Sequence, residues 1–136
     1  MNVRSLPWGL IGVVLLLALV GLGNLGRGTM ALHYACLLPD LPMTVPWAYL
    51  AGTGIFWGTV LLACAVALAM RRPWSRRATL GMATLYQAHA WLNHLLDASD
   101  YARQTWPRDL MLSALFLIAV WGALSLPAVR HLFHSR

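Results

Sequence analysis

Four long apolar runs, separated by short segments that carry most of the charge, constrain this chain more than any other feature. The runs cover residues 7–26, 47–70, 78–96 and 109–127. A helix that crosses the hydrocarbon core of a bilayer needs about 20 consecutive apolar residues, and each run comes close to that length. We therefore predict an all-α integral membrane protein, in which residues 1–136 form a single transmembrane domain, a bundle of four membrane-spanning helices.

The composition supports a membrane protein. Hydrophobic residues make up 60% of the chain and charged residues 10%, whereas about a quarter of the residues in a typical soluble domain are charged. A chain with so little polar surface is stable only with lipid as its solvent. The net charge is +6, but the arginines flank the apolar runs, where they meet phospholipid head groups. Membrane lipids are therefore the predicted partners, and nucleic acid is not.

The segments between the runs are predicted to be two outer loops, 27–46 and 97–108, and a turn at 71–77. The helical pattern of the first run either ends at residue 26 or continues as far as Cys36. Three prolines between Leu38 and Pro46 exclude helix after that point. At the start of the fourth helix, Thr105 or Trp106 is the expected cap, with Pro107 in the first turn.

The distribution of arginine predicts the orientation. In a four-span protein both termini and the 71–77 turn lie on one side, and these segments hold seven of the ten arginines. Because cytoplasmic segments are enriched in basic residues, we predict an N-in, C-in protein of the bacterial inner (cytoplasmic) membrane. Four arginines of the turn are expected to contact lipid head groups: Arg71, Arg72, Arg76 and Arg77.

The third run carries a polar stripe. At about 100° per residue, four polar side chains fall on one narrow helix face: Tyr86, His89, Asn93 and Asp97. His94 flanks this face, while leucines cover the opposite one. A polar stripe that faced lipid would be strongly destabilising, so it is expected to point into the bundle or toward another protein.

The first outer loop is predicted to return to the same side of the membrane as the upper end of this stripe. It contributes Arg27, His33 and Asp40, and the sequence therefore predicts a polar pocket between this loop and the third helix. On one interpretation the stripe residues only form interhelical hydrogen bonds that determine packing. On the other they bind a ligand.

A quinone or another lipid-like molecule is the favoured ligand. Such a molecule needs an apolar slot that ends in one or two hydrogen-bonding groups, which the stripe residues could supply. Metal or haem is disfavoured because no HxxxH, ExxH or CxxC spacing occurs. No metal site and no catalytic residue is predicted, and a non-catalytic role is favoured over an enzymatic one.

The second run contains a GxxxG motif. Gly54 and Gly58 lie one helical turn apart, so both fall on one helix face and allow another helix to approach closely. The motif predicts close helix packing without identifying the partner helix.

The layout of residues 8–95 resembles the DoxX-like group of small four-helix bacterial membrane proteins. The shared features are a glycine-rich first run, a proline-containing outer loop and a second run entered as Pro46-Trp-Ala-Tyr-Leu-Ala-Gly-Thr-Gly54. A short arginine-bearing turn then leads into an alanine- and leucine-rich third run. The resemblance implies a four-helix bundle linked to quinone or thiol redox chemistry.

Three functions are consistent with these features. The first is a non-catalytic accessory or scaffolding subunit of a larger respiratory or photosynthetic membrane complex, because the chain is small, has short loops and lacks a catalytic constellation. The second is a DoxX-like, quinone- or redox-associated protein with its pocket on the third helix. The third is a small transporter built by self-association, since one four-helix unit is too thin to enclose a broad pore.

Overall fold

The computed structural model describes residues 7–40, 45–96 and 100–134, and these residues contain helices and no strand. The helices are α1 (Trp8–Leu37), α2 (Trp47–Ala69), α3 (Ser75–Leu96), α4 (Asp100–Ser125) and α5 (Pro127–His134). The predicted all-α class is confirmed.

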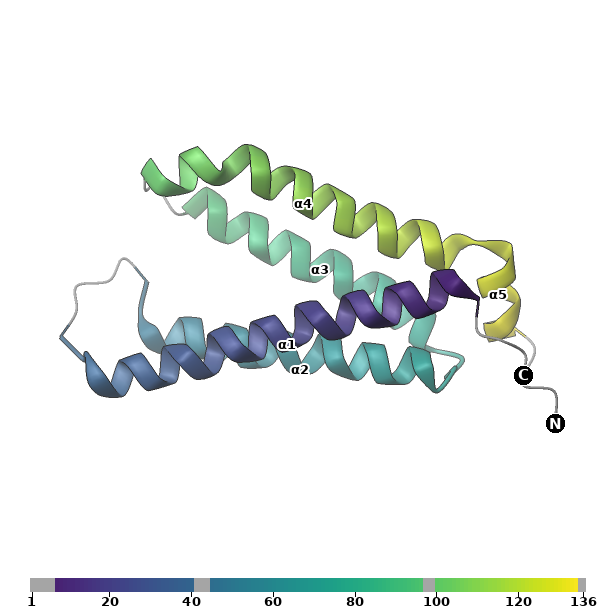
Figure 1. Cartoon of the computed structure of the whole chain (residues 1–136), viewed down its shortest axis with the longest axis horizontal. Coiled ribbons are helices and arrows are strands. Elements are labelled where there is room, and N and C mark those ends of the chain that lie inside the picture. The colour runs from purple at the N-terminus through teal and green to yellow at the C-terminus, as the bar shows by residue number, and fades with distance from the viewer. Residues whose placement is uncertain (1–6, 41–44, 97–99, 135–136) are drawn as a thin grey trace.

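The helices form two pairs that make a wedge (Figure 1). One pair is α1 with α2, and the other is α3 with α4. The pairs converge at the end that carries α5 and the turn between α2 and α3, which we call the closed end. They diverge toward the other end of the molecule, the open end, where α1 and α3 finish and α2 and α4 begin.

Backbone contact between glycines holds α1 against α2. A Cβ atom added to Gly54 would lie 2.7 Å from the Cα of Gly28, and one added to Gly58 would lie 2.9 Å from the carbonyl oxygen of Gly21. Neither distance leaves room for a side chain. The structure therefore places the GxxxG motif of α2 against the glycines of α1, where helices without side chains at the contact approach most closely.

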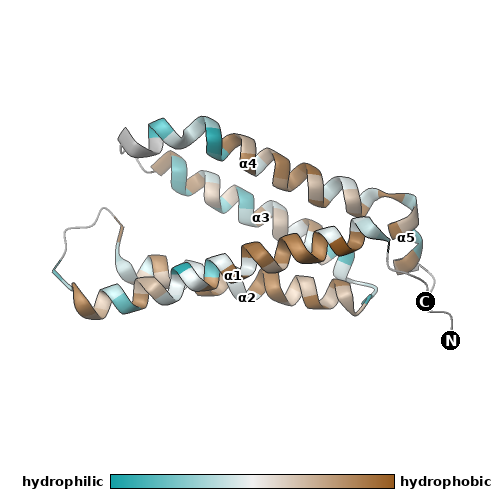
Figure 2. Ribbon diagram, viewed as in Figure 1, coloured by the Kyte–Doolittle hydropathy of each residue, from teal (hydrophilic) through white to brown (hydrophobic). Residues whose placement is uncertain are grey.

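The apolar core lies at the closed end (Figure 2). It is made of fully or nearly fully buried side chains from all five helices, among them Leu10, Leu17, Leu61, Leu68, Ala83, Val120, Leu124, Val129 and Phe133. Val129 and Phe133 belong to α5, and a single residue separates α5 from the end of α4. α4 ends just before Pro127, whose ring disfavours the helical conformation for the residue before it. Pro127 suits the first position of the next helix, where a backbone N–H would have no intrahelical partner. The segment that follows α4 is therefore a helix whose apolar side covers the core.

Two predicted outer loops are partly helical. α1 continues without a break to Leu37, so 27–37 is helix rather than loop. No proline interrupts α1, and the helix ends at Leu37, where Pro39 disfavours the helical conformation for the residue before it. α4 begins at Asp100, so the structure is helical through most of the predicted 97–108 loop. Pro107 lies inside α4, and neither Thr105 nor Trp106 caps it.

Three helices are long and apolar enough to cross a membrane: α1, α2 and the Arg103–Ser125 part of α4. α3 is not among them because its polar side chains lower its hydropathy. Many large apolar side chains are exposed along the three apolar helices, including Leu15, Leu19, Leu115 and Ile118. The accessible surface is 9219 Å², compared with about 7,000 Å² expected for a compact soluble protein of this mass. The chain is thus an open helical structure with an apolar exterior.

Candidate functional site

A cavity of about 230 Å³ lies between α1, α2 and α3, on the side of the apolar core that faces the open end. Its polar and aromatic lining comes from Arg27, Trp57, Tyr86, His89, Asn93 and His94. Five of these six residues belong to the site predicted from the sequence, and Trp57 is the addition. The helical repeat explains why residues 86, 89 and 93 of α3 reach one cavity, because residues three and four apart share a helix face.

The other predicted site residues do not contribute to this cavity. His33 and Asp40 are exposed and do not line it. Because α1 stays helical, His33 lies about 9 Å further along the helix axis than Arg27. In the structure Arg27 lines the cavity from α1, and His33 and Asp40 lie outside it. Asp97 lies outside the described residues.

Asn24 connects α1 to α3 at the edge of the cavity. This side chain is 7% exposed. Its Nδ2 donates to the carbonyl oxygen of Val20 at 2.8 Å and to the hydroxyl of Tyr86 at 3.0 Å. Its Oδ1 accepts a hydrogen bond from Arg27 at 3.3 Å. Sequence reasoning missed Asn24, although an asparagine inside an apolar run is itself a signal of an interhelical hydrogen bond.

A second chain of hydrogen bonds connects α2 to α3. The Tyr49 hydroxyl donates to Asn93 Oδ1 at 2.7 Å, and Asn93 Nδ2 lies 3.1 Å from His89 Nε2. The indole ring of Trp57 packs between the α3 side chains, with its centroid 5.4 Å from that of Tyr86 and 5.7 Å from that of His89. The polar stripe is therefore held in place by both helices of the other pair.

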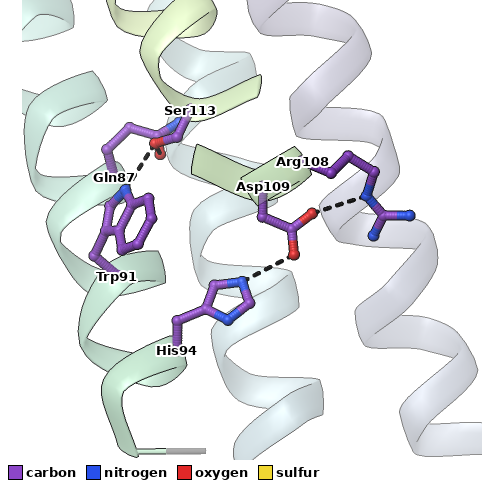
Figure 3. A network of polar contacts seen from close by, with 6 residues as sticks. All are labelled: Gln87, Trp91, His94, Arg108, Asp109 and Ser113. Carbon is purple, nitrogen blue, oxygen red and sulfur yellow. Dashed lines mark hydrogen bonds and ion pairs between the residues drawn. The ribbon is translucent and has the colours of Figure 1, made fainter. Parts of the chain in front are cut away.

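The face of α3 that meets α4 is polar as well (Figure 3). Trp91 Nε1 donates to Ser113 Oγ at 2.9 Å, and the Ser113 hydroxyl donates to Gln87 Oε1. His94 Nε2 lies 3.1 Å from one carboxylate oxygen of Asp109, whose other oxygen accepts from Arg108. His94 therefore borders the cavity while its Nε2 pairs with α4.

These contacts surround a second hollow of about 240 Å³ between α1, α3 and α4. Tyr86 lines both hollows, and Phe116 closes the second one toward the apolar core. The Tyr86 and Phe116 rings pack edge to face with centroids 6.1 Å apart. Tyr86 is thus the side chain at which the core and both hollows meet.

The basic residues of the α2–α3 turn do not act alike. Arg72 and Arg77 are exposed, as expected for contact with lipid head groups. Arg71 adopts a positive φ of 53° in the turn. Arg76 turns inward, and its Nε donates to the carbonyl oxygen of Leu124 at 2.7 Å. This bond satisfies a carbonyl that the end of α4 leaves without an intrahelical partner, so Arg76 connects α3 to the end of α4. Its contact with lipid head groups stays a prediction.

The cavity lining offers hydrogen bonds and aromatic surface. Among the described residues, the lining includes no carboxylate, thiol or aliphatic hydroxyl, and therefore no nucleophile paired with a base. Among the residues that the structure describes, no three His, Cys, Asp or Glu side chains lie close enough to hold a metal ion together. The arrangement is suited to binding a molecule by its polar end.

No protein-family model, curated protein or solved structure matches this chain. The resemblance to the DoxX-like group therefore stays a prediction.

Proposed function

We propose that this chain is a four-span membrane protein that binds the polar head of a lipid-like molecule, such as a quinone, between its two helix pairs. One observation carries the proposal: the cavity that opens beside the apolar core is lined by hydrogen-bonding side chains from three helices. A membrane protein keeps polar side chains at such depth when they bond one another or a ligand.

The fourth span in this proposal is α3. Its 22 residues extend about 33 Å, enough for a hydrocarbon core of about 30 Å. Its side chains Tyr86, Asn93 and Trp91 make hydrogen bonds to α1, α2 and α4. The exposed residues of α3 include Leu85, Leu92 and Leu95. Packed in this way, α3 would present an apolar surface to lipid.

The orientation of the proposed bundle can be tested with the two native cysteines. Cys36 is exposed near the open end, whereas Cys64 is buried. In the N-in, C-in orientation, a membrane-impermeant maleimide added to intact cells should label the native protein, and the Cys36→Ser variant should not be labelled. Arg77→Cys in the Cys36→Ser background should react only after the membrane is permeabilised. Labelling of that cysteine in intact cells would refute the orientation.

The dimensions of the cavity suit a head group better than a whole ligand. A volume of about 230 Å³ lies below the range of about 300–1,000 Å³ that is usual for complete small-molecule sites. The tail of an amphiphile would lie outside the cavity, along the large apolar side chains that the helices expose. An apolar tail and a hydrogen-bonded head would therefore both find complementary surface.

Purification in a mild detergent, followed by extraction and mass spectrometry of bound lipids, tests the proposal. We expect an amphiphile to co-purify with the native protein, and the His89→Ala variant to retain at least about tenfold less of it, because the variant loses a ring that borders the cavity and a hydrogen bond that positions Asn93. His33→Ala, which changes an exposed histidine of α1, is the matched control and should retain the amphiphile. If the native protein carries none and binds none when it is supplied, the proposal fails.

A second candidate is an accessory subunit of a larger membrane complex. The many large apolar side chains that the helices expose favour it, because helices of a partner protein could pack against them. The same purification separates the two candidates. A stoichiometric protein partner without a bound amphiphile would support the accessory role.

A further inference from the structure

The hydrogen bonds around the cavity leave donors unused on side chains that line it. The Tyr86 oxygen accepts from Asn24, so the hydroxyl hydrogen of Tyr86 remains for another acceptor. Arg27 donates from Nη2 to Asn24, and its guanidinium group carries further N–H donors. Neither donor has another acceptor among the described residues.

His89 adds a third donor. Asn93 Oδ1 accepts the hydrogen bond from the Tyr49 hydroxyl. The Nδ2 of the same amide, which can only donate, therefore faces His89 Nε2. His89 Nε2 therefore accepts, and in the neutral ring the proton lies on Nδ1. The hydrogen-bond network thus selects the tautomer of His89 in which Nδ1 is the donor.

Among the residues that the structure describes, the charge at the cavity has one sign. Arg27 is the permanently charged residue of this lining, and no described carboxylate borders the cavity. Asp109 of α4 lines the neighbouring hollow and is paired with His94 and Arg108. A cation beside unused donors is complementary to a negatively charged group that carries several acceptor oxygens.

We infer that the cavity binds an anionic head group, a phosphate or a carboxylate, with Arg27 supplying the charge and Tyr86 and His89 supplying hydrogen bonds. This inference rests on the proposed function and narrows its ligand from lipid-like molecules in general to anionic ones. A neutral head would leave the charge of Arg27 without a partner in the cavity.

Three amphiphiles with the same oleoyl chain test the inference on the full chain in a neutral maltoside detergent. Oleoyl lysophosphatidic acid and oleate carry anionic heads, and mono-olein carries a neutral one. Titration calorimetry should show that both anions bind at least about tenfold more tightly than mono-olein, the effect of a charge-assisted hydrogen bond. Equal affinities for all three would overturn the anionic head group and leave the proposed function intact. Binding of none would overturn both.

Variants assign the preference to Arg27. Arg27→Gln should reduce the affinity for both anions to that for mono-olein, whereas Arg27→Lys, which keeps the charge, should retain most of the preference. Arg103→Gln is the matched control, because Arg103 is exposed on α4 and does not line the cavity. An undiminished preference in a folded Arg27→Gln protein, judged by circular dichroism, would overturn the assignment. Should that variant not fold, the comparison of head groups on the native protein still decides the inference.

Competition with inorganic phosphate identifies the source of the anion. If millimolar phosphate displaces oleate from the native protein, the cavity takes a free anion. If it does not, the ligand is the head group of a lipid, held in addition by its tail.

Discussion

Replacing Gly58 by alanine is expected to destabilise the protein by about 2–3 kcal/mol, the upper range for overpacking a close contact. A Cβ atom at this position would lie 2.8 Å from the backbone nitrogen of Leu25 and 2.9 Å from the carbonyl oxygen of Gly21. Backbone atoms cannot rotate away as a side chain can, so α1 and α2 must separate. The measurement is unfolding of the purified protein by dodecyl sulfate in mixed micelles, followed by tryptophan fluorescence.

Gly52→Ala is the control for this change. A Cβ atom on Gly52 would meet nothing within 4 Å, and alanine is favoured over glycine in a helix by about 1 kcal/mol. The same substitution in the same helix should therefore leave stability unchanged or raise it slightly. Equal effects at the two positions would mean that helix propensity, and not close packing of α2 on α1, determines the result.

Replacing Phe116 by alanine is expected to cost about 2–3 kcal/mol of unfolding free energy, less than the 3–5 kcal/mol typical of soluble cores. In a membrane the released side chain meets lipid instead of water, so mainly the packing contribution is lost. Phe116 is 8% exposed, and its ring supports that of Tyr86. The loss should therefore also weaken ligand binding at the cavity.

The neighbouring residue provides the control for Phe116. Leu115 is 55% exposed, and Leu115→Ala should change the free energy of unfolding by less than about 0.5 kcal/mol, the usual range for surface positions. Both variants can be compared in one dodecyl sulfate titration. A loss at Leu115 as large as that at Phe116 would indicate that this face of α4 is covered by protein instead of lipid.

Much of the candidate site could be predicted from the local sequence. The stripe on α3 follows from helical geometry alone, because residues three and four apart share a face whatever surrounds the helix. The GxxxG spacing of α2 likewise indicates a close helix contact before its partner is known. The lengths of the apolar runs predicted helices at nearly the right places, and three of these helices are long and apolar enough to cross a membrane.

The ends of the helices were harder to predict from the sequence. The 27–37 extension of α1 contains no proline, so the local sequence permitted both a helix and a loop there. Its helical state brings Gly28 against α2. Pro107 predicted a helix start, yet α4 begins earlier and contains that proline, which shows that one missing N–H does not by itself terminate a helix.

The alternation of apolar runs and arginine clusters by itself determined the helical class, the approximate helix positions and the residues of the α3 stripe, because each depends on neighbours a few positions apart. The tertiary structure decided which side chains complete the site. Asn24 and Tyr86 are 62 residues apart, and Tyr49 and Asn93 are 44 apart, so only the packing of whole helices brings them together. The tertiary structure also decided that the helices form a wedge. Glycines allow backbone contact between α1 and α2. Larger side chains separate this pair from α3 and α4, and the cavity lies between α1, α2 and α3.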